Sequence, residues 1–315
     1  MRKPANIALL GADDPLGEAI LHLLSEREVE LGEVFPLSLS ESDGCATVRG
    51  EEIPLRDVTE FDWSQADILV NAVRSVAASR IEAIAAQAGC RVIGFGQGAG
   101  AGGRLALEGG VSIALHRVLA PIQQDAALTS VTAVAILPVA VAGEAGVAEL
   151  AAQTRALFSM EKPEPEVFPL QIAFNLIPQV GHLQPDGSSQ MEQDVAQEVR
   201  TLLDRPELPV SVTALWAPLF YGAGVTMHAT VREGVDIERL RKRLARQDGV
   251  TLMDASLPGG VATPGTDAQD SDGVFVSRIR LGADGHRDVA MWLVIDMVRL
   301  EATRAVDCVE NLIEK

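Results

Sequence analysis

The stretch that most constrains the fold is NIALLGADDPLGEAILHLL, residues 6–24. It runs from a short apolar segment through a glycine into a segment whose apolar residues recur at helical spacing. Strand, glycine turn and helix in this order can leave bare backbone N–H groups at a helix N-terminus, where they can hold the pyrophosphate of a dinucleotide. Gly11 and Gly17 fit such a turn, together with Ala12 and Leu16. Because similar spacings also occur by chance in α/β proteins, a working nucleotide loop and a tight structural turn are equally good interpretations.

Two carboxylates stand in this turn, at Asp13 and Asp14. Acidic side chains are favourable beside a helix N-terminus and can cap it, but they repel a phosphate group placed there. The turn therefore keeps the shape of an anion site while its charge is reversed.

The first third of the chain alternates segments of strand and helix character. Strands are expected at residues 6–11, 33–39, 66–73 and 91–96, and helices at 15–28 and 77–90. Such alternation predicts a parallel sheet covered by helices. A glycine-dense stretch, residues 94–110, then suits a loop or a crossing between domains.

The rest of the chain has a different pattern of expected elements, with long apolar strands and few helices. Helices are expected near residues 144–158, 190–203 and 235–246, and a last one, 297–315, could return to the first domain. Several strands with few helices between them favour a largely antiparallel α+β arrangement. We therefore predict an α/β protein with a Rossmann-like parallel sheet from residues 1–121 and 297–315, and an α+β domain over residues 122–296.

Composition and charge exclude several classes of function. At 315 residues with 47% hydrophobic content, the chain is long enough for two domains with a substantial core. The formal net charge of −18 opposes nucleic-acid binding. We expect no signal peptide and no membrane span, and hence a cytoplasmic protein. The three cysteines have neither metal-ligand nor disulfide spacing, so reduced thiols and no metal are expected.

Five segments further along the chain carry a more specific pattern. In order they are AGEAGVAELAAQT, FPLQIAFNLIPQVG, LFYGAGVTMHATV, TPGTDAQDSDGVFVSRIR and MWLVIDMVRLEATRAV. Their order and spacing resemble those of the aspartate-semialdehyde dehydrogenases over nearly the whole chain. Within that family the chain is most similar to the Usg-type paralogs, which lack the catalytic cysteine. QIAFNLIPQ, residues 171–179, is the most specific match, and it is a structural signature that argues for fold and descent.

The resemblance implies where the family's catalytic groups would stand. That reaction uses a cysteine thiolate that forms a thioester, a histidine that transfers protons, a glutamine that orients the intermediate, and arginines that hold the substrate. The corresponding positions here are Gly110 for the cysteine, Leu137 for the glutamine, Trp216 for a substrate arginine and Ala223 for the histidine. We therefore expect no catalytic residue of the family's kind and a protein without dehydrogenase activity.

A second interpretation stays open, namely an active NAD(P)-dependent oxidoreductase. The resemblance implies that it would act on aspartate semialdehyde or a related aldehyde in amino-acid biosynthesis. One of the family's charged substrate contacts persists, as Glu192, while a nearby lysine becomes Asp194. The sequence is thus compatible with a protein without dehydrogenase activity and with an active oxidoreductase.

Other reactive residues fit a catalytic role poorly. Cys90 begins a strand, where a small buried thiol is expected, and Ser112 lacks a paired base. His228 alternates with apolar neighbours, which is typical of a strand face. For Arg278 and Arg280, an ion pair between strands or across an interface and a residual anion site are equally good interpretations.

Cofactor contacts implied by the resemblance are also altered. Asp14 replaces a family glycine, Glu41 stands where the family often presents an arginine to the adenosine 2′-phosphate, and Glu301 replaces a glycine near the expected cofactor path. We therefore expect no bound cofactor, with NAD binding weak at most and NADP more strongly disfavoured.

The resemblance further implies a homodimer formed through the second domain. VTAVAILPVAVA and DVAMWLVID are nearly continuous apolar runs, which need cover on both faces of a sheet. The three helices expected within residues 122–296 can cover one face, and a two-fold mate would cover the other.

Overall fold

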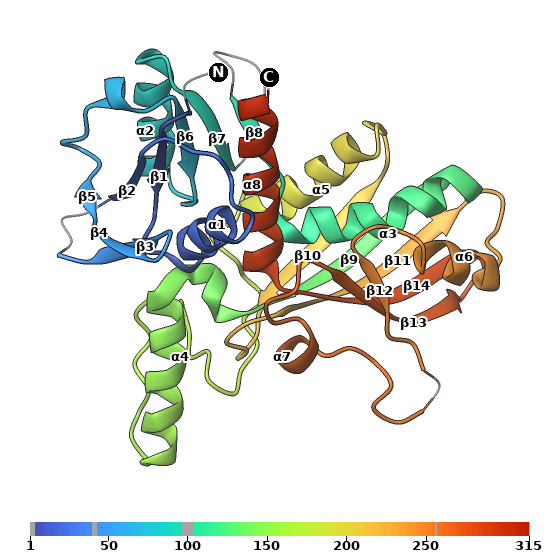
Figure 1. Cartoon of the computed structure of the whole chain (residues 1–315). Helices are drawn as coiled ribbons and strands as arrows, with labels where there is room; N and C mark the ends of the chain where they lie inside the picture. Colours follow the sequence, from blue (N-terminus) through green and yellow to red (C-terminus); the bar gives the residue numbers. More distant parts are fainter. Residues whose placement is uncertain (1–3, 40–42, 96–103, 256, 315) are drawn as a thin grey trace. The chain divides into compact units, whose positions relative to one another are not determined.

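The computed structural model describes residues 4–39, 43–95, 104–255 and 257–314. The chain forms two compact units: unit 1 comprises Met1–Glu108 and Glu301–Lys315, and unit 2 comprises Gly109–Leu300. Figure 1 shows that each unit is built around one large β-sheet with helices packed against it. The predicted fold class, a Rossmann-like parallel sheet followed by an α+β domain, is confirmed.

Unit 1 holds a six-stranded sheet in the order β5-β2-β1-β6-β7-β8, in which every pairing is parallel. Its strands are β1 (Ile7–Leu10), β2 (Val34–Ser38), β5 (Arg56–Asp57), β6 (Ile68–Asn71), β7 (Arg91–Phe95) and β8 (Leu105–Leu107). Its helices are α1 (Pro15–Glu26), α2 (Val76–Gln87), the short 3-10 helix η1 (Trp63–Gln65) and most of α8 (Met297–Glu314). A separate hairpin joins β3 (Cys45–Val48) to β4 (Glu51–Pro54).

Two glycines shape the turn between β1 and α1. Gly11 has a φ of +79°, a left-handed conformation that glycine adopts without steric cost. A Cβ atom on Gly17, in the first turn of α1, would come within 1.9 Å of the Gly11 carbonyl oxygen. The helix can therefore pack this closely onto the end of β1 only because residue 17 is glycine. Pro15 begins α1, and Ile20 and Leu23 are buried on its apolar side, as the helical spacing predicts.

Unit 2 holds a second six-stranded sheet, in the order β10-β9-β11-β14-β13-β12. Its strands are β9 (Leu128–Leu137), β10 (Val210–Trp216), β11 (Ala223–Val231), β12 (Val250–Leu252), β13 (Val274–Gly282) and β14 (Gly285–Ile295). The helices are α3 (Gly110–Ala126), α4 (Gly143–Phe158), α5 (Gln190–Leu202), α6 (Ile237–Leu244), the short α7 (Pro264–Asp267) and the 3-10 helix η2 (Val139–Ala142). The three central pairings are antiparallel, and the outer strands β10 and β12 pair in parallel, so the largely antiparallel prediction is confirmed.

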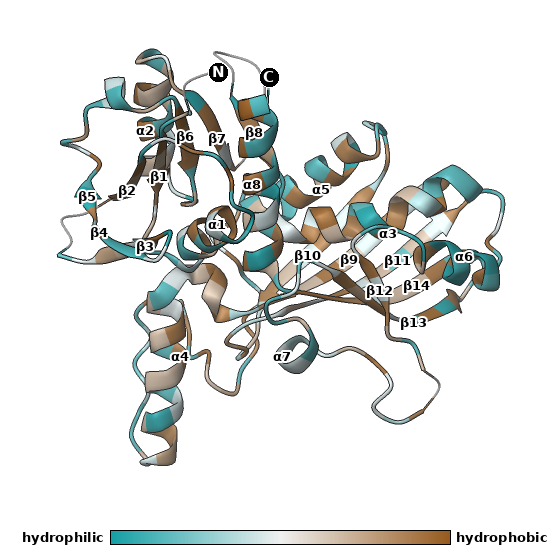
Figure 2. Ribbon diagram, viewed as in Figure 1, coloured by the Kyte–Doolittle hydropathy of each residue, from teal (hydrophilic) through white to brown (hydrophobic). Residues whose placement is uncertain are grey.

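The main core of unit 2 lies between its sheet and three helices. α3, α5 and α6 pack on the same face of the sheet (Figure 1). Alternate strand residues on that face, such as Ala135, Val225 and Met291, are fully buried. Figure 2 shows the same division by hydropathy, with apolar strands and a mostly hydrophilic α6. On the opposite face Thr132 and His228 are exposed, so the helices of this unit leave that part of the sheet uncovered.

The crossing between the units differs from the expected one. It falls at residues 108/109 rather than 121/122, because α3 already packs against β9, β11 and β14 of the second sheet. Unit 1 resumes at residue 301 rather than 297. The three helices expected inside the second domain are present as α4, α5 and α6. In the described part of the chain, none of the helices combines the length and the apolar character needed to cross a membrane.

Candidate functional site

The positions inferred for the catalytic groups meet at one end of the unit 2 sheet. β9 ends at Leu137 and β10 ends at Trp216, and these two residues are directly paired. β11 begins at Ala223, which is paired with Ile295 at the end of β14. Since β11 lies between β9 and β14, residues far apart in the sequence are brought to one small region of the sheet.

Gly110, the first residue of α3, lies against Met297, just beyond the end of β14. A Cβ atom at position 110 would come within 2.9 Å of Met297 Cγ and 3.2 Å of the Met297 carbonyl oxygen. A cysteine side chain here would therefore require both the side chain and the backbone of Met297 to move. The sequence contains no signal for this contact, because Met297 lies in another segment of the chain and belongs to no polar motif.

The other three positions are filled by apolar side chains of the core. Leu137 and Ala223 are fully buried, and Trp216 is 7% exposed. The Trp216 ring packs edge-on against Phe168, with ring centroids 5.2 Å apart. Trp216 also exchanges two backbone hydrogen bonds with Ile177, in the QIAFNLIPQ segment. These three positions thus offer close packing and no side-chain proton donor or acceptor apart from the indole N–H.

The N-terminus of α3 already holds a carboxylate from the chain itself. Glu198 on α5 accepts a hydrogen bond from the Gly109 N–H, with a distance of 2.9 Å from N to Oε2. Backbone N–H groups at a helix N-terminus attract anions, and here an internal side chain takes that place. Glu198 was not found from the sequence, since 89 residues separate it from Gly109.

Glu192, at a position inferred for a family substrate contact, is occupied by backbone contacts. Its Oε2 accepts the Ser189 N–H at 2.7 Å, completing a capping box at the start of α5. Its Oε1 accepts the Ala214 N–H of β10 at 2.8 Å. Asp194 accepts a hydrogen bond from Gln190 on the same helix. Glu192 therefore ties α5 to the sheet through both of its oxygens.

The remaining reactive side chains lie apart from this region or lack an activating partner. Cys90 is 2% exposed and its Sγ donates to the Ala66 carbonyl, while burial, with a smaller contribution from Asp67, raises the pKa of the thiol. The Ser112 Oγ is buried and has no hydrogen-bond partner among the described residues. His228 is exposed on the face of β11, as the alternation predicts. No pair of nucleophile and base forms among these three side chains.

In unit 1 the glycine turn brings the four candidate cofactor residues together. Gly11 and Gly17 make the close backbone contact described above, and Ala12 and Leu16 are buried beside them. The two carboxylates lie at the same turn. Asp13 Oδ2 accepts a hydrogen bond from Ser38 Oγ at 2.8 Å, and a Cβ on Gly11 would lie 3.4 Å from Asp14 Oδ2. Glu41, the third acidic residue considered from the sequence, lies outside the described residues.

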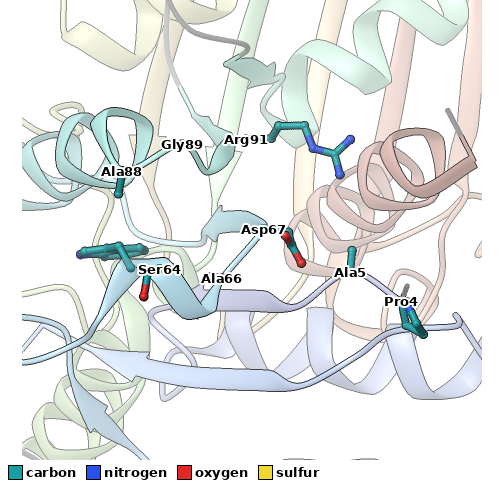
Figure 3. A pocket seen from close by; sticks show the side chains of 9 residues that line it. Pro4, Ala5, Ser64, Ala66, Asp67, Ala88, Gly89 and Arg91 are labelled. Atoms are coloured by element: carbon teal, nitrogen blue, oxygen red, sulfur yellow. The ribbon is translucent and has the colours of Figure 1, made fainter. Parts of the chain in front are cut away.

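A polar surface pocket of about 500 Å³ lies elsewhere in unit 1, and Figure 3 shows the side chains around it. Its residues include Ala5, Asp67 and Arg91, which lie at the amino ends of β1, β6 and β7. Open parallel sheets bind ligands beyond the carboxyl ends of their strands, which is the opposite edge. Asp67 also already accepts the Asn6 N–H, and Arg91 donates to the Leu312 carbonyl. The pocket is therefore separate from the predicted nucleotide turn.

Arg278 and Arg280 lie on β13 and are exposed. Arg278 has a φ of +55° at a shift in the register between β13 and β14. Within the described residues neither arginine forms an ion pair, so an interface ion pair and an anion site remain the two interpretations for them. The same described residues contain no group of three or more His, Cys, Asp or Glu side chains that could hold a metal ion.

Comparison with known proteins identifies the class that this fold defines. The chain belongs to the semialdehyde dehydrogenase family: residues 6–97 match the semialdehyde dehydrogenase NAD binding domain, and residues 119–300 match the semialdehyde dehydrogenase dimerisation domain. A USG-1 protein homolog from Azotobacter vinelandii is 29% identical over 343 residues, which cover 100% of this chain and 99% of the relative.

Aspartate-semialdehyde dehydrogenases are similar over the same length. Aspartate-semialdehyde dehydrogenase 2 of Vibrio cholerae is 31% identical, with 99% of each chain covered. The crystal structure of aspartate semialdehyde dehydrogenase II complexed with ASA, from Vibrio cholerae, matches with a TM-score of 0.91 at 28% identity and covers 100% of this chain and 99% of that chain. Membership of the aspartate-semialdehyde dehydrogenase family is therefore confirmed over the whole chain.

Proposed function

We propose that this chain is a non-catalytic member of the aspartate-semialdehyde dehydrogenase family, a cytoplasmic homodimer that keeps the two-domain fold without the dehydrogenase reaction. The observation that carries the proposal is the close-packed apolar end of the unit 2 sheet. There Leu137, Trp216 and Ala223 occupy positions inferred for catalytic groups. Gly110 supplies no nucleophile, and Met297 fills the space that a side chain there would need.

The family's chemistry cannot run through these four positions. A thioester route requires a thiolate to form the covalent intermediate and a second group to move the proton. Without both groups the route itself is absent, rather than slower. Trp216 in the place of an arginine also lacks the planar pair of N–H donors that a substrate carboxylate would bind.

The direct test is an assay of phosphate-dependent NADP reduction with aspartate semialdehyde. We expect no turnover above background, while aspartate-semialdehyde dehydrogenase 2 of Vibrio cholerae, assayed alongside, serves as the active control. Robust turnover by the wild type would overturn the proposal, and turnover that survived a Cys90→Ala substitution would show that another residue is the nucleophile.

The second candidate function is an active NAD(P)-dependent oxidoreductase on aspartate semialdehyde or a related aldehyde. It is favoured by the glycine turn, where Gly11 and Gly17 keep the close backbone packing that a nucleotide loop needs. The two functions differ in their need for a cofactor. Titration with NADH and NADPH separates them, because an oxidoreductase of this kind has to bind one of them.

The side chains around the turn do not fit a dinucleotide. Asp13 and Asp14 bring negative charge to the N-terminus of α1, where a pyrophosphate would lie. Asp14 is partly buried and Asp13 is exposed. Both carboxylates repel a phosphate group at this turn, salt screens the repulsion less at the partly buried one, and the extra phosphate of NADP increases the repulsion. We therefore expect weak NAD binding at most and still weaker NADP binding by calorimetry. A micromolar affinity for NADP would contradict this expectation.

Two surfaces of unit 2 support the homodimer. The sheet face opposite α3, α5 and α6 carries Val134 and Ile136, both partly exposed. Large apolar side chains are also exposed at the end of α4 and along the segment that follows it: Phe158, Met160, Leu170, Phe174 and Leu176. Apolar surface of this extent is typical of a protein interface, and the match to a dimerisation domain makes a second copy the expected partner.

Light scattering at low micromolar concentration tests the dimer. We expect roughly twice the 33.4 kDa mass of one chain, as is usual for a large apolar interface. Val134→Glu, which places a charge on the open sheet face, should give monomers, while Gln193→Glu on the exposed side of α5 should not. A stable wild-type monomer would contradict the proposal.

A further inference from the structure

A stacked ion pair lies at the carboxyl edge of the unit 1 sheet. The guanidinium of Arg74 lies over the ring of Phe95, with 3.7 Å from Cζ to the ring centroid. The same guanidinium donates from Nη2 to Glu301 Oε1 at 2.7 Å. The Glu301 side chain is 3% exposed and that of Arg74 is 41% exposed, so the carboxylate is buried beneath the stacked arginine.

The order of the strands places this cluster where open α/β sheets bind ligands. The chain passes from β1 through α1 to β2 on one side of β1, and β6 then pairs on the other side. Such a reversal is the point where open α/β sheets bind ligands, beyond the carboxyl ends of the strands. Arg74 follows the carboxyl end of β6, and Phe95 is the last residue of β7.

The cluster also adjoins the glycine turn. A Cβ atom on Gly11 would come within 2.4 Å of Val73 Cγ2, so the segment that carries Arg74 lies directly against the turn. The planar guanidinium therefore covers an aromatic face at the edge where a planar ring of a ligand would stack. Its charge is also neutralised by Glu301, so it does not offer a phosphate group a cation free of internal pairing.

We propose that Arg74, Phe95 and Glu301 form an internal plug that keeps dinucleotides out of unit 1, independently of the carboxylates in the turn. This inference rests on the proposed loss of cofactor use and gives it a structural cause. Two devices then act together: Asp13 and Asp14 repel the phosphates, and the plug occupies the ligand edge of the sheet. Removing either device alone leaves the other in place.

The test measures NADH binding by fluorescence titration of four full-length proteins. They are the wild type, Asp13→Asn with Asp14→Asn, Arg74→Ala with Glu301→Ala, and the combination of all four substitutions. Removing both members of the ion pair avoids leaving a buried charge alone. We expect no saturable binding by the wild type, and at least ~10-fold tighter binding by the fourfold variant than by either double variant.

A matched control removes a different ion pair that also anchors α8. Arg27, the C-cap residue of α1, donates to Asp307 at 2.7 Å and to Glu310 at 3.1 Å on α8. Arg27→Ala with Asp307→Ala, added to the two asparagine substitutions, should leave the NADH affinity unchanged. Should the double alanine variant not fold, Arg74→Ala with Glu301→Gln opens the stack while it keeps an amide at the buried position.

The outcomes separate the plug from the proposed function. Equal NADH affinity with and without Arg74 and Glu301, in proteins whose turn carries asparagines, would overturn the plug alone. Micromolar binding of NADH by the wild type would overturn the plug and, with it, the proposed loss of cofactor use. Turnover of aspartate semialdehyde by the wild type would instead overturn the proposed function.

Discussion

Gln153 on α4 provides the sharpest test of how the family's signature segment is held in place. It is 2% exposed, and its Oε1 accepts two backbone N–H groups, those of Ile172 at 2.9 Å and of Ala173 at 3.1 Å. Its Nε2 donates to Glu149, whose other oxygen accepts the N–H groups of residues 166 and 167. The two side chains thus bind an irregular segment that contains QIAFNLIPQ to the helix.

Gln153→Ala should be strongly destabilising. Ile172 and Ala173 are fully buried, so the substitution leaves two buried N–H groups without acceptors. Each such group costs about 1–3 kcal/mol, and partial relaxation makes about 2–4 kcal/mol a reasonable total. The higher helix propensity of alanine recovers only a few tenths of that. For a protein of this size the loss corresponds to a fall in Tm of roughly 4–16 °C.

Thermal unfolding followed by circular dichroism measures this fall. Gln193→Ala is the control, since Gln193 is an exposed helical glutamine and its loss should change the free energy of unfolding by less than about 0.5 kcal/mol. Limited proteolysis should show faster cleavage within residues 166–176 in the Gln153 variant. If that variant melts within about 1 °C of the wild type, the segment does not depend on these hydrogen bonds.

Three further predictions concern single positions in unit 2. Gly224→Ala would place a Cβ 2.3 Å from the Trp292 ring and should cost about 1–3 kcal/mol in chemical denaturation, whereas Gly265→Ala, with open space around it, should cost less. Glu198→Ala removes the acceptor of the Gly109 N–H at the start of α3, and we expect a loss of about 0.5–2 kcal/mol, to be checked by the same denaturation. Burial raises the pKa of Asp296, against the opposing hydrogen bonds from Arg299 and Asp270, so its stabilising contribution is lost as pH rises through the folded-state pKa. Asp296→Asn should therefore gain stability relative to the wild type between pH 4 and 8, and a Tm difference that did not change with pH would contradict this.

The regular elements could be predicted because their signals are local. The apolar spacing of α1, the apolar strand β1 and the apolar start of β6 each predict the element that the structure contains. The hairpin of β3 and β4 was missed because its strands are short and partly polar. Its turn places Arg49 and Gly50 at φ +53° and +82°, the geometry of a type I′ turn, for which arginine is an unusual first residue.

The sequence predicted the positions of the candidate site residues but not the contacts around them. Motif positions placed Gly110, Leu137, Trp216 and Ala223 on the chain, but packing decides what surrounds them. The contact of Met297 with Gly110 and the ion pair of Arg74 with Glu301, separated by 227 residues, follow from tertiary structure alone. Hydrophobic periodicity describes residues within one helix or strand, so it cannot predict contacts between residues that lie in different elements.

The kind of residue at the four inferred positions bears on why the fold persists. Buried histidine, glutamine and arginine side chains destabilise a core unless every polar group is paired, and an active site accepts that cost for catalysis. In this chain Leu137, Ala223 and Trp216 are packed into the core instead, and Phe168 stacks against the tryptophan. Close packing at these positions stabilises the folded scaffold, and the proposed non-catalytic role is one that depends on the folded protein itself.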